Sequence, residues 1–177
     1  MRVFVGIDLP ADLKRKIFVF AQRITKGLKV KLVEEENLHL SLVFLGEIEE
    51  EKVERVKALL ARVKVGEIEL SLARLEVFPS KARPQLIWIR VKGQTGKLFS
   101  LYKQTVDGLL GEGFILKKNA LQFLPHITIA RIKGGGVRSM EGELIEGKFT
   151  AKKVTLFKSQ LTSTGPLYSK IGEFAVK

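Results

Sequence analysis

Two tetrapeptides that begin with histidine share one pattern, and this pattern constrains the local fold more than any other feature of the chain. They are His39-Leu40-Ser41-Leu42 and His126-Ile127-Thr128-Ile129, and they contain the only two histidines among the 177 residues. Alternate side chains of a β-strand point to the same side, so each histidine shares a face with the hydroxyl two residues later. Each tetrapeptide is therefore predicted to lie on a strand with one apolar and one polar face.

The repetition indicates a function for the two histidines. A single buried histidine is usually structural and satisfied by local hydrogen bonds. A hydroxyl two residues after both histidines would arise by chance about once in 120 cases, before the aliphatic neighbours are counted. Two such strands facing one another would bring together an acid and a base of near-neutral pKa.

The composition excludes several classes of function. With 45% hydrophobic residues the chain can bury a sizeable core, and the absence of cysteine excludes disulfides, thiolate catalysis and cysteine-held zinc. No apolar run has the length of a membrane span, and the first residues read as a strand instead of a signal peptide, so a cytoplasmic protein is expected. The formal net charge of +12 favours an anionic partner such as nucleic acid, although a generally basic surface would also account for it.

Apolar spacing along the chain predicts an alternation of strands and helices. Helices are expected from Pro10 to about Leu28, over 49–63 and over 96–110. The predicted strands cover residues 2–8, 30–33, 38–45, 67–78, 86–91, 126–132, 148–161 and 167–176. The glycines that follow Lys133 are interpreted as a turn, because they lack the Lys-Ser/Thr ending of a nucleotide-binding loop.

The order strand, helix, histidine-bearing strand occurs twice, which is a weak internal repeat. It predicts one bilobal α+β domain over 1–177, with two lobes related by a pseudo-twofold axis, antiparallel sheets and flanking helices. The histidines would then meet across a central groove between the lobes.

Two histidines, each beside a hydroxyl, favour phosphodiester chemistry without a metal. One histidine can act as base and the other as acid, while the hydroxyls hydrogen-bond a non-bridging phosphate oxygen. A metal site would need more strong ligands than two isolated histidines supply. A serine hydrolase is disfavoured because the chain has no Gly-x-Ser-x-Gly elbow.

With these motifs the chain resembles the 2H phosphoesterases, which are named for two His-x-Thr/Ser-x motifs. Within that superfamily it resembles the RNA 2′,3′-cyclic phosphodiesterases, also called 2′-5′ RNA ligases. The resemblance covers nearly the whole chain and is carried by residues 2–10, 36–46, 125–131 and 161–168. The first motif has serine where most relatives have threonine, which retains the hydroxyl but loses the stiffer β-branched side chain.

The resemblance implies metal-independent hydrolysis of an RNA 2′,3′-cyclic phosphate end to a 2′-phosphomonoester, without a cofactor. It implies that His39 donates a proton to the departing 3′ oxygen and that His126 accepts one from water. The residues alone do not assign these two roles. The implied phosphate-binding residues are Ser41, Thr128 and Arg131, and Phe44 is the implied base-stacking residue. RNA ends, including those derived from tRNA, are the implied partner of a monomer that binds no membrane, and 2′-5′ ligation is an implied secondary activity.

Arg131 and Phe44 each follow a histidine by five residues and are therefore out of phase with it in a regular strand. These two side chains can lie on the same side of the sheet as the histidines only if the strand has a bulge, a twist or an end at this point. Without one, Arg131 is a surface arginine and Phe44 a core phenylalanine.

Two alternatives of different kinds stay open. The basic charge fits a non-catalytic RNA-binding module with structural histidines. The motifs also fit a 2H enzyme that acts on a small cyclic nucleotide, because shared motifs do not fix the substrate.

Overall fold

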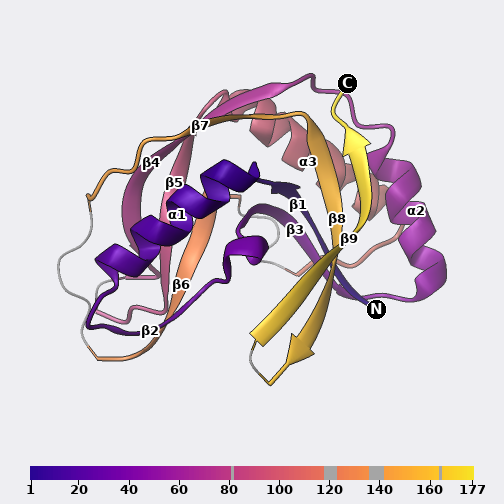
Figure 1. Ribbon diagram of the computed structural model, residues 1–177. Helices are drawn as coiled ribbons and strands as arrows, with labels where there is room; N and C mark the ends of the chain where they lie inside the picture. Colours follow the sequence, from indigo (N-terminus) through magenta and orange to yellow (C-terminus); the bar gives the residue numbers. More distant parts are fainter. Residues whose placement is uncertain (81, 118–122, 136–141, 164) are drawn as a thin grey trace.

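The computed structural model is an α+β fold with two antiparallel sheets and three α-helices, as the sequence predicted (Figure 1). It describes residues 1–80, 82–117, 123–135, 142–163 and 165–177. In spatial order the four-stranded sheet consists of β3 (His39–Glu47), β1 (Arg2–Asp8), β8 (Lys153–Thr162) and β9 (Gly165–Ala175). The five-stranded sheet consists of β2 (Lys29–Leu32), β6 (His126–Gly134), β5 (Leu86–Gly93), β4 (Ile68–Phe78) and β7 (Lys148–Ala151).

The helices tie the two sheets together. The α-helices are α1 (Ala11–Ile24), α2 (Glu50–Leu60) and α3 (Thr95–Gly111), and a short 3-10 helix, η1 (Glu35–Asn37), precedes β3. Although α1 connects two strands that lie in different sheets, it contacts β6 of the five-stranded sheet, and α3 contacts both β3 and β4. Figure 1 shows α1 lying across the five-stranded sheet. In the described part of the chain, no helix is long and apolar enough to cross a membrane.

The predicted repeat is confirmed. Each of its two units contains a pair of antiparallel strands, and a helix lies between the two strands in the sequence. β1 pairs with β3 in one unit, and β5 pairs with β6 in the other. The predicted strand over 148–161 was wrong in one respect. Lys152 divides it into β7, which pairs with β4, and β8, which pairs with β1, so the chain changes sheet at this residue. The predicted turn after Lys133 begins later, because β6 continues to Gly134, and its last glycine lies outside the described residues.

Each histidine-bearing strand contains a β-bulge three residues after its histidine. In β3, Ser41 pairs with Gly6 and Val43 with Val5, which leaves Leu42 as the extra residue. In β6, Thr128 pairs with Trp88 and Ala130 with Ile87, which leaves Ile129 as the extra residue. A bulge of this kind shifts the alternation of side chains by one position. Residues beyond it therefore change face relative to a regular strand.

The burial of both strands shows the effect of the bulges. Two consecutive residues are buried in each strand, Leu42 with Val43 and Ile129 with Ala130. The next residue then returns to the face that carries the histidine, where Phe44 is 55% exposed and Arg131 is also exposed. The bulge that Arg131 and Phe44 required is thus present in both strands. The alternative of a core position for Phe44 is therefore wrong, because its side chain is exposed.

Gly6 permits the close approach of β1 and β3 beside His39. A Cβ atom at Gly6 would lie 2.8 Å from the backbone oxygen of Leu40 and 3.5 Å from Cδ2 of His39. We expect Gly6→Ala to lower the free energy of unfolding by about 1–3 kcal/mol, because the two strands must separate to accept the methyl group. Urea unfolding measures this change.

Gly96→Ala is the matched control, because Gly96 lies in the first turn of α3 with nothing within 4 Å of the added Cβ. It should leave stability unchanged or raise it by up to about 1 kcal/mol. Equal stability of the two variants would contradict the packing explanation.

Candidate active site

His39 is held by hydrogen bonds at both ring nitrogens. Its Nδ1 lies 2.6 Å from the carbonyl oxygen of Asn37, and its Nε2 lies 2.8 Å from Oγ of Ser41. A carbonyl only accepts, so Nδ1 of the neutral ring carries the proton and donates it to Asn37. Nε2 then has a free lone pair, which accepts the hydroxyl proton of Ser41. The expected pairing of His39 with the hydroxyl two residues later is confirmed.

His126 is anchored in the same way. Its Nδ1 lies 2.5 Å from the carbonyl oxygen of Leu124, which again stands two residues before the histidine. The same argument assigns the proton to Nδ1 and leaves a lone pair on Nε2. Thr128 pairs with Trp88 and lies on the same face of the sheet as His126, whose cross-strand neighbour is Arg90. Both histidines are therefore fixed in the tautomer that offers Nε2 for proton transfer.

Aromatic rings from three strands surround His39. The ring centroids of Phe4 on β1 and Phe157 on β8 lie 4.8 and 5.6 Å from that of His39. Tyr168 on β9 meets the imidazole edge-on at 5.3 Å. These contacts restrict rotation of the imidazole and remove much of it from water.

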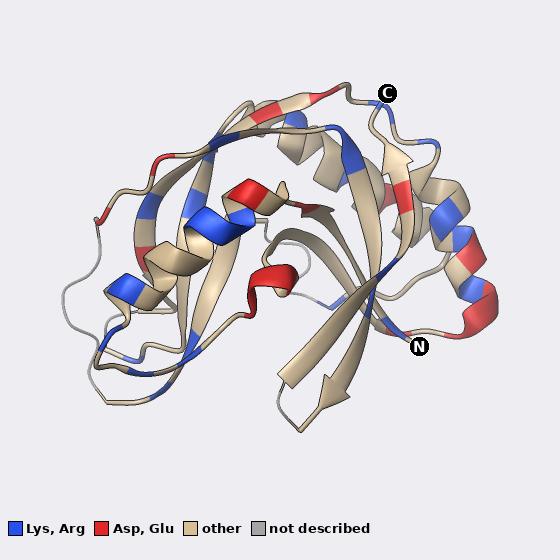
Figure 2. Ribbon diagram, in the orientation of Figure 1, with Lys and Arg blue, Asp and Glu red and all other residues tan. Residues whose placement is uncertain are grey.

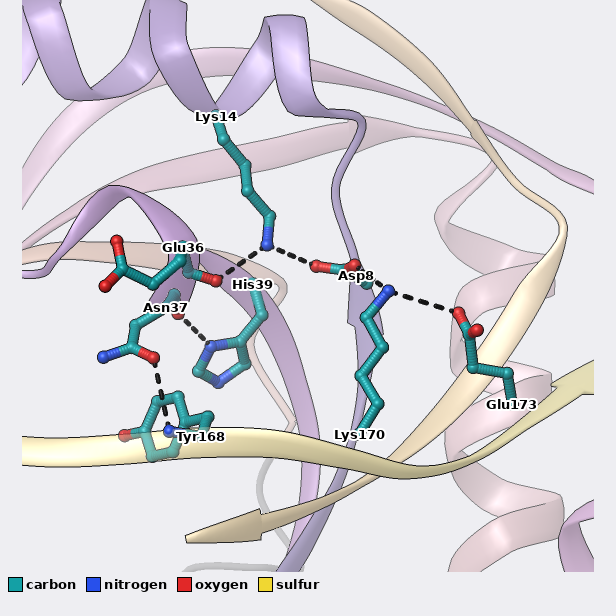
Figure 3. Close-up of polar contacts among 8 residues, drawn as sticks. All are labelled: Asp8, Lys14, Glu36, Asn37, His39, Tyr168, Lys170 and Glu173. Atoms are coloured by element: carbon teal, nitrogen blue, oxygen red, sulfur yellow. Dashed lines mark hydrogen bonds and ion pairs between the residues drawn. The ribbon is translucent and has the colours of Figure 1, made fainter. Parts of the chain in front are cut away.

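A charged network lies behind His39 and holds the loop that accepts its Nδ1 proton (Figure 3). Nζ of Lys14 lies 2.6 Å from Asp8 and donates to the carbonyl of Glu36 at 2.8 Å, and Lys170 lies 2.5 Å from the second oxygen of Asp8. Burial raises the pKa of Asp8, but the hydrogen bonds from Lys14 and Lys170 outweigh it and the net pKa is lowered. The carboxylate is therefore charged at neutral pH.

Asn37 connects this loop to the β8–β9 hairpin. Its buried side chain donates to the carbonyl of Pro166 at 2.9 Å and accepts from the backbone N–H of Tyr168 at 3.4 Å. The backbone carbonyl of the same residue holds His39. Asn37 thus fixes the position of His39 relative to the aromatic ring of Tyr168.

His126 lies in different surroundings. Its ring centroid is 4.0 Å from that of Trp88, whose Nε1–H donates to Glu76 at 3.0 Å. The same carboxylate accepts a 2.7 Å hydrogen bond from Arg90 and another from Arg74. Burial raises the pKa of Glu76, but these donors outweigh it and the net pKa is lowered. A charged carboxylate therefore fixes the indole against which His126 packs.

The pKa of each histidine is lowered, chiefly by burial. For His39 burial is the largest cause and brings the pKa to about 4, with the charges of Lys14 and His126 acting in the same direction and Asp8 acting against them. For His126 burial again lowers the pKa, and Arg90 adds to this while Glu76 opposes it. Both rings are therefore neutral at pH 7 in the free protein. β3 and β6 pack against one another, which places the histidines within electrostatic reach of each other.

The structure brings the six predicted site residues to the site-facing side of the two strands. The ring of Phe44 lies 5.4 Å from that of Phe4, which also contacts His39. Arg131 lies beside the hydroxyl of Tyr168. Burial raises the pKa of this phenol although Arg131 and Arg2 oppose it, so Tyr168 stays protonated at neutral pH. Tyr168 thus contacts one residue from each half of the repeat.

Sequence reasoning missed several residues that surround the histidines. Asn37 and Tyr168 belong to the runs that carry the family resemblance, but no spacing rule linked them. Trp88 was visible as the only tryptophan of the chain. Glu76 gave no signal, because its position relative to Trp88 depends on the pairing of β4 with β5.

Comparisons with known proteins show the family of the chain. A sequence model described as LigT like phosphoesterase matches residues 7–88. The RNA 2′,3′-cyclic phosphodiesterase of Methanocaldococcus jannaschii is 34% identical over 181 residues, which cover 98% of this chain and 100% of that protein. The chain belongs to the RNA 2′,3′-cyclic phosphodiesterase family. The family member from Aquifex aeolicus is also 34% identical, over 187 residues that cover 98% of this chain and 96% of that protein.

Solved structures show the same fold. The Thermus thermophilus protein TT0787 superposes with a TM-score of 0.84 at 27% identity, covering 99% of this chain and 98% of that chain. Escherichia coli LigT complexed with 3′-AMP superposes with a TM-score of 0.81 at 23% identity, covering 99% of this chain and 96% of that chain. Both superpositions extend over the two-sheet architecture described above.

The two histidines can be titrated individually by NMR, because the chain has no others. We expect a pKa of about 4 for His39 and a value below 6.5 for His126. Asp8→Asn should lower the pKa of His39 further, because the carboxylate stabilises the imidazolium. Lys14→Met should raise it, because a nearby cation is lost.

The pKa of His126 is the internal control in both variants, because neither Asp8 nor Lys14 contributes to its shift. A pKa of His39 near 6.5, or shifts of the same sign in both variants, would contradict the described environment.

Proposed function

We propose that the protein hydrolyses the 2′,3′-cyclic phosphate at an RNA end to a 2′-phosphomonoester, with His39 and His126 as the acid and base. The observation that carries this proposal is the repeated anchor at Nδ1. Each histidine gives its Nδ1 proton to the carbonyl two residues earlier and so keeps Nε2 for proton transfer. A structural role would not require the same tautomer at both positions.

The reaction needs one proton accepted and one donated. A water molecule attacks phosphorus while Nε2 of His126 takes its proton, and the P–O3′ bond breaks as Nε2–H of His39 protonates the departing oxygen. This leaves the phosphate on O2′, and the histidines exchange their protonation states, which solvent restores. The assignment of acid to His39 and base to His126 follows the family resemblance.

Ser41 couples the protonation of His39 to phosphate binding. Its hydroxyl donates to Nε2 while the ring is neutral. Once Nε2 carries a proton it can no longer accept, so the hydroxyl of Ser41 is released to donate to a non-bridging phosphate oxygen. Thr128 supplies the second hydroxyl, and Arg131 supplies a cation on the same face of β6. Phe44 is exposed beside Phe4 and offers a stacking surface to the terminal base.

The bound phosphate adjusts the charge of the site. Burial and neighbouring cations hold both histidines neutral in the free protein. An anionic phosphodiester beside them favours the imidazolium form and raises both pKa values. The acid is therefore charged mainly when the substrate is present, which couples its activation to binding.

Several observations support RNA as the substrate. The net charge of +12 favours a polyanion, and the relatives from M. jannaschii and A. aeolicus are named for the RNA reaction. Joining of RNA ends through a 2′-5′ linkage is the reverse-type reaction and is secondary in this proposal. The same chain supplies both histidines and both hydroxyls of the site, so we propose that a single domain acts as a monomer.

His39→Ala and His126→Ala should each lower kcat about 10²- to 10⁴-fold on an oligonucleotide with a 2′,3′-cyclic phosphate, because each removes one proton transfer. Wild-type turnover should persist in EDTA and give only the 2′-phosphate product. Chromatography of the products against 2′- and 3′-phosphate standards measures both rate and outcome.

A cyclic phosphorothiolate with sulfur in place of O3′ separates the two roles. Thiolate leaves without protonation, so this substrate should restore much of the activity of His39→Ala and little of that of His126→Ala. The opposite pattern would reverse the acid and base, and full turnover by both alanine variants on the oxygen substrate would refute the proposal.

The pH dependence of kcat/KM should be bell-shaped with its maximum below pH 6.5. This constant reports the free protein, in which the pKa of His39 is about 4 and that of His126 is also below 6.5. Above pH 6.5 the acid form is progressively lost, so kcat/KM should fall about tenfold per pH unit. The profile of kcat should peak at higher pH, because bound phosphate raises both values. A kcat/KM that stays constant from pH 5 to 8 would contradict this account.

A further inference from the structure

A row of four cross-strand neighbours crosses the five-stranded sheet on the face that carries His126. Phe78 pairs with Leu86, Leu86 with Arg131, and Arg131 with Lys31. Directly opposed residues of antiparallel strands point to the same side, so the four side chains form one line from β4 to β2. With strands about 4.8 Å apart this line is about 14 Å long. It runs beside the line that contains Trp88 and Thr128.

Phe78 offers an exposed aromatic surface at one end of this row. It is 38% exposed, and its ring stacks on that of Trp88 with centroids 4.5 Å apart. Trp88 is only 5% exposed and packs in turn on His126 at 4.0 Å. Glu76 fixes the indole through its Nε1–H. The ring of Phe78 therefore packs on Trp88 and is partly exposed to solvent, as stacking with a base requires.

The other end of the row carries positive charge. Within the described residues, neither Arg131 nor Lys31 takes part in an ion pair, and the same holds for Lys29 and Lys133 on the same two strands. In Figure 2 basic residues mark this end of the five-stranded sheet. Arg74 and Arg90 on the same sheet differ, because both form ion pairs with Glu76. The row thus has an apolar stacking end and a cationic end.

We propose that this row binds the RNA strand that leads to the cyclic phosphate. A base upstream of the terminal nucleotide stacks on Phe78, and an internal phosphate contacts Lys31 with Arg131. The inference rests on the proposed function and extends it, because Phe44 and the two histidines serve the terminal nucleotide while the row serves the nucleotides before it. It makes the enzyme selective for oligomeric RNA ends over mononucleoside cyclic phosphates.

The β8–β9 hairpin limits the row at its cationic end. A Cβ atom at Gly165 would lie 2.8 Å from Nζ of Lys31, and Tyr168 of the same hairpin lies beside Arg131. The bound RNA strand would therefore lie between the β8–β9 hairpin at one end of the row and Phe78 at the other. Arg131 stands at the junction, next to the terminal phosphate and the first internal one.

The test compares two substrates, adenosine 2′,3′-cyclic phosphate and a tetranucleotide that ends in the same group. Phe78→Leu and Lys31→Gln should each lower kcat/KM for the tetranucleotide about tenfold, because stacking or charge pairing is lost. Both should leave kcat/KM for the mononucleoside within about twofold of wild type. Lys31→Gln should also reduce the slope of log KM against log salt by about 0.7 for the tetranucleotide.

Phe99→Leu and Lys16→Gln are matched controls. Phe99 is 53% exposed on α3, and Lys16 is exposed on α1, so neither lies on the row. Neither control should change kcat/KM for either substrate. Equal losses on both substrates in Phe78→Leu would show that this ring acts through Trp88 and His126, and would overturn the proposal. Unchanged rates in both row variants would also overturn it.

A binding measurement keeps the inference independent of turnover. Trp88 is the only tryptophan and lies beneath Phe78, so its fluorescence should change when a tetranucleotide with a 2′-phosphate end binds. If the wild type cleaves neither substrate, the proposed function is refuted, but this titration still tests whether the row binds RNA. Weaker binding by Lys31→Gln than by Lys16→Gln would support the row, and equal binding would refute it.

Discussion

One extra residue in each histidine-bearing strand determines which side chains reach the site. The bulges at Leu42 and Ile129 direct two consecutive aliphatic residues into the core and return the next residue to the polar face. A regular strand would bury Phe44 and turn Arg131 away from His126. The hydrophobic effect stabilises the bulge, because it adds the side chains of Val43 and Ala130 to the core. The stacking surface and the cation of the site are thus consequences of core packing on the opposite face.

The repeat gives the two histidines the same anchor but different environments. In both cases the carbonyl two residues earlier takes the Nδ1 proton, a local contact that any strand entering in this conformation can make. The neighbours come from other strands and therefore differ. His39 lies among three aromatic rings with Asp8 and Lys14 behind it, whereas His126 packs on one indole held by Glu76. In the proposed reaction, equal geometry with unequal surroundings separates two identical side chains into an acid and a base.

The sequence predicted the elements that depend on local pattern. Alternation located β1, β3 and β6, and helical spacing located α1 and α3. The paired histidines and hydroxyls were predicted for the same reason, since a period of two residues fixes their common face. The bulges were not predicted in this way, because regular alternation was assumed, although the adjacent apolar pairs Leu42-Val43 and Ile129-Ala130 interrupt that alternation in both strands. Lys152 gives no sign that the chain changes sheet there. Contacts between distant segments were also beyond the reach of sequence pattern, because Asn37 meets the β8–β9 hairpin across more than a hundred residues.

The order of strands in the sheets explains why the two repeated units do not form the whole site by themselves. It places β8 beside β1 and leaves β9 at the edge, so that Tyr168 reaches His39 and Arg131 from opposite halves of the repeat. Each half supplies a histidine and a hydroxyl, but the last two strands supply the aromatic rings Phe157 and Tyr168 and the hydrogen bonds to Asn37. The same strands limit the line of residues from Phe78 to Lys31, because Gly165 and Tyr168 stand at its cationic end. An RNA strand on this face would contact both copies of the repeat and the hairpin at once. Selection for oligomeric RNA would then come from Phe78, which lies outside the repeat, together with Lys31 on β2, while the chemistry stays with the repeated motifs.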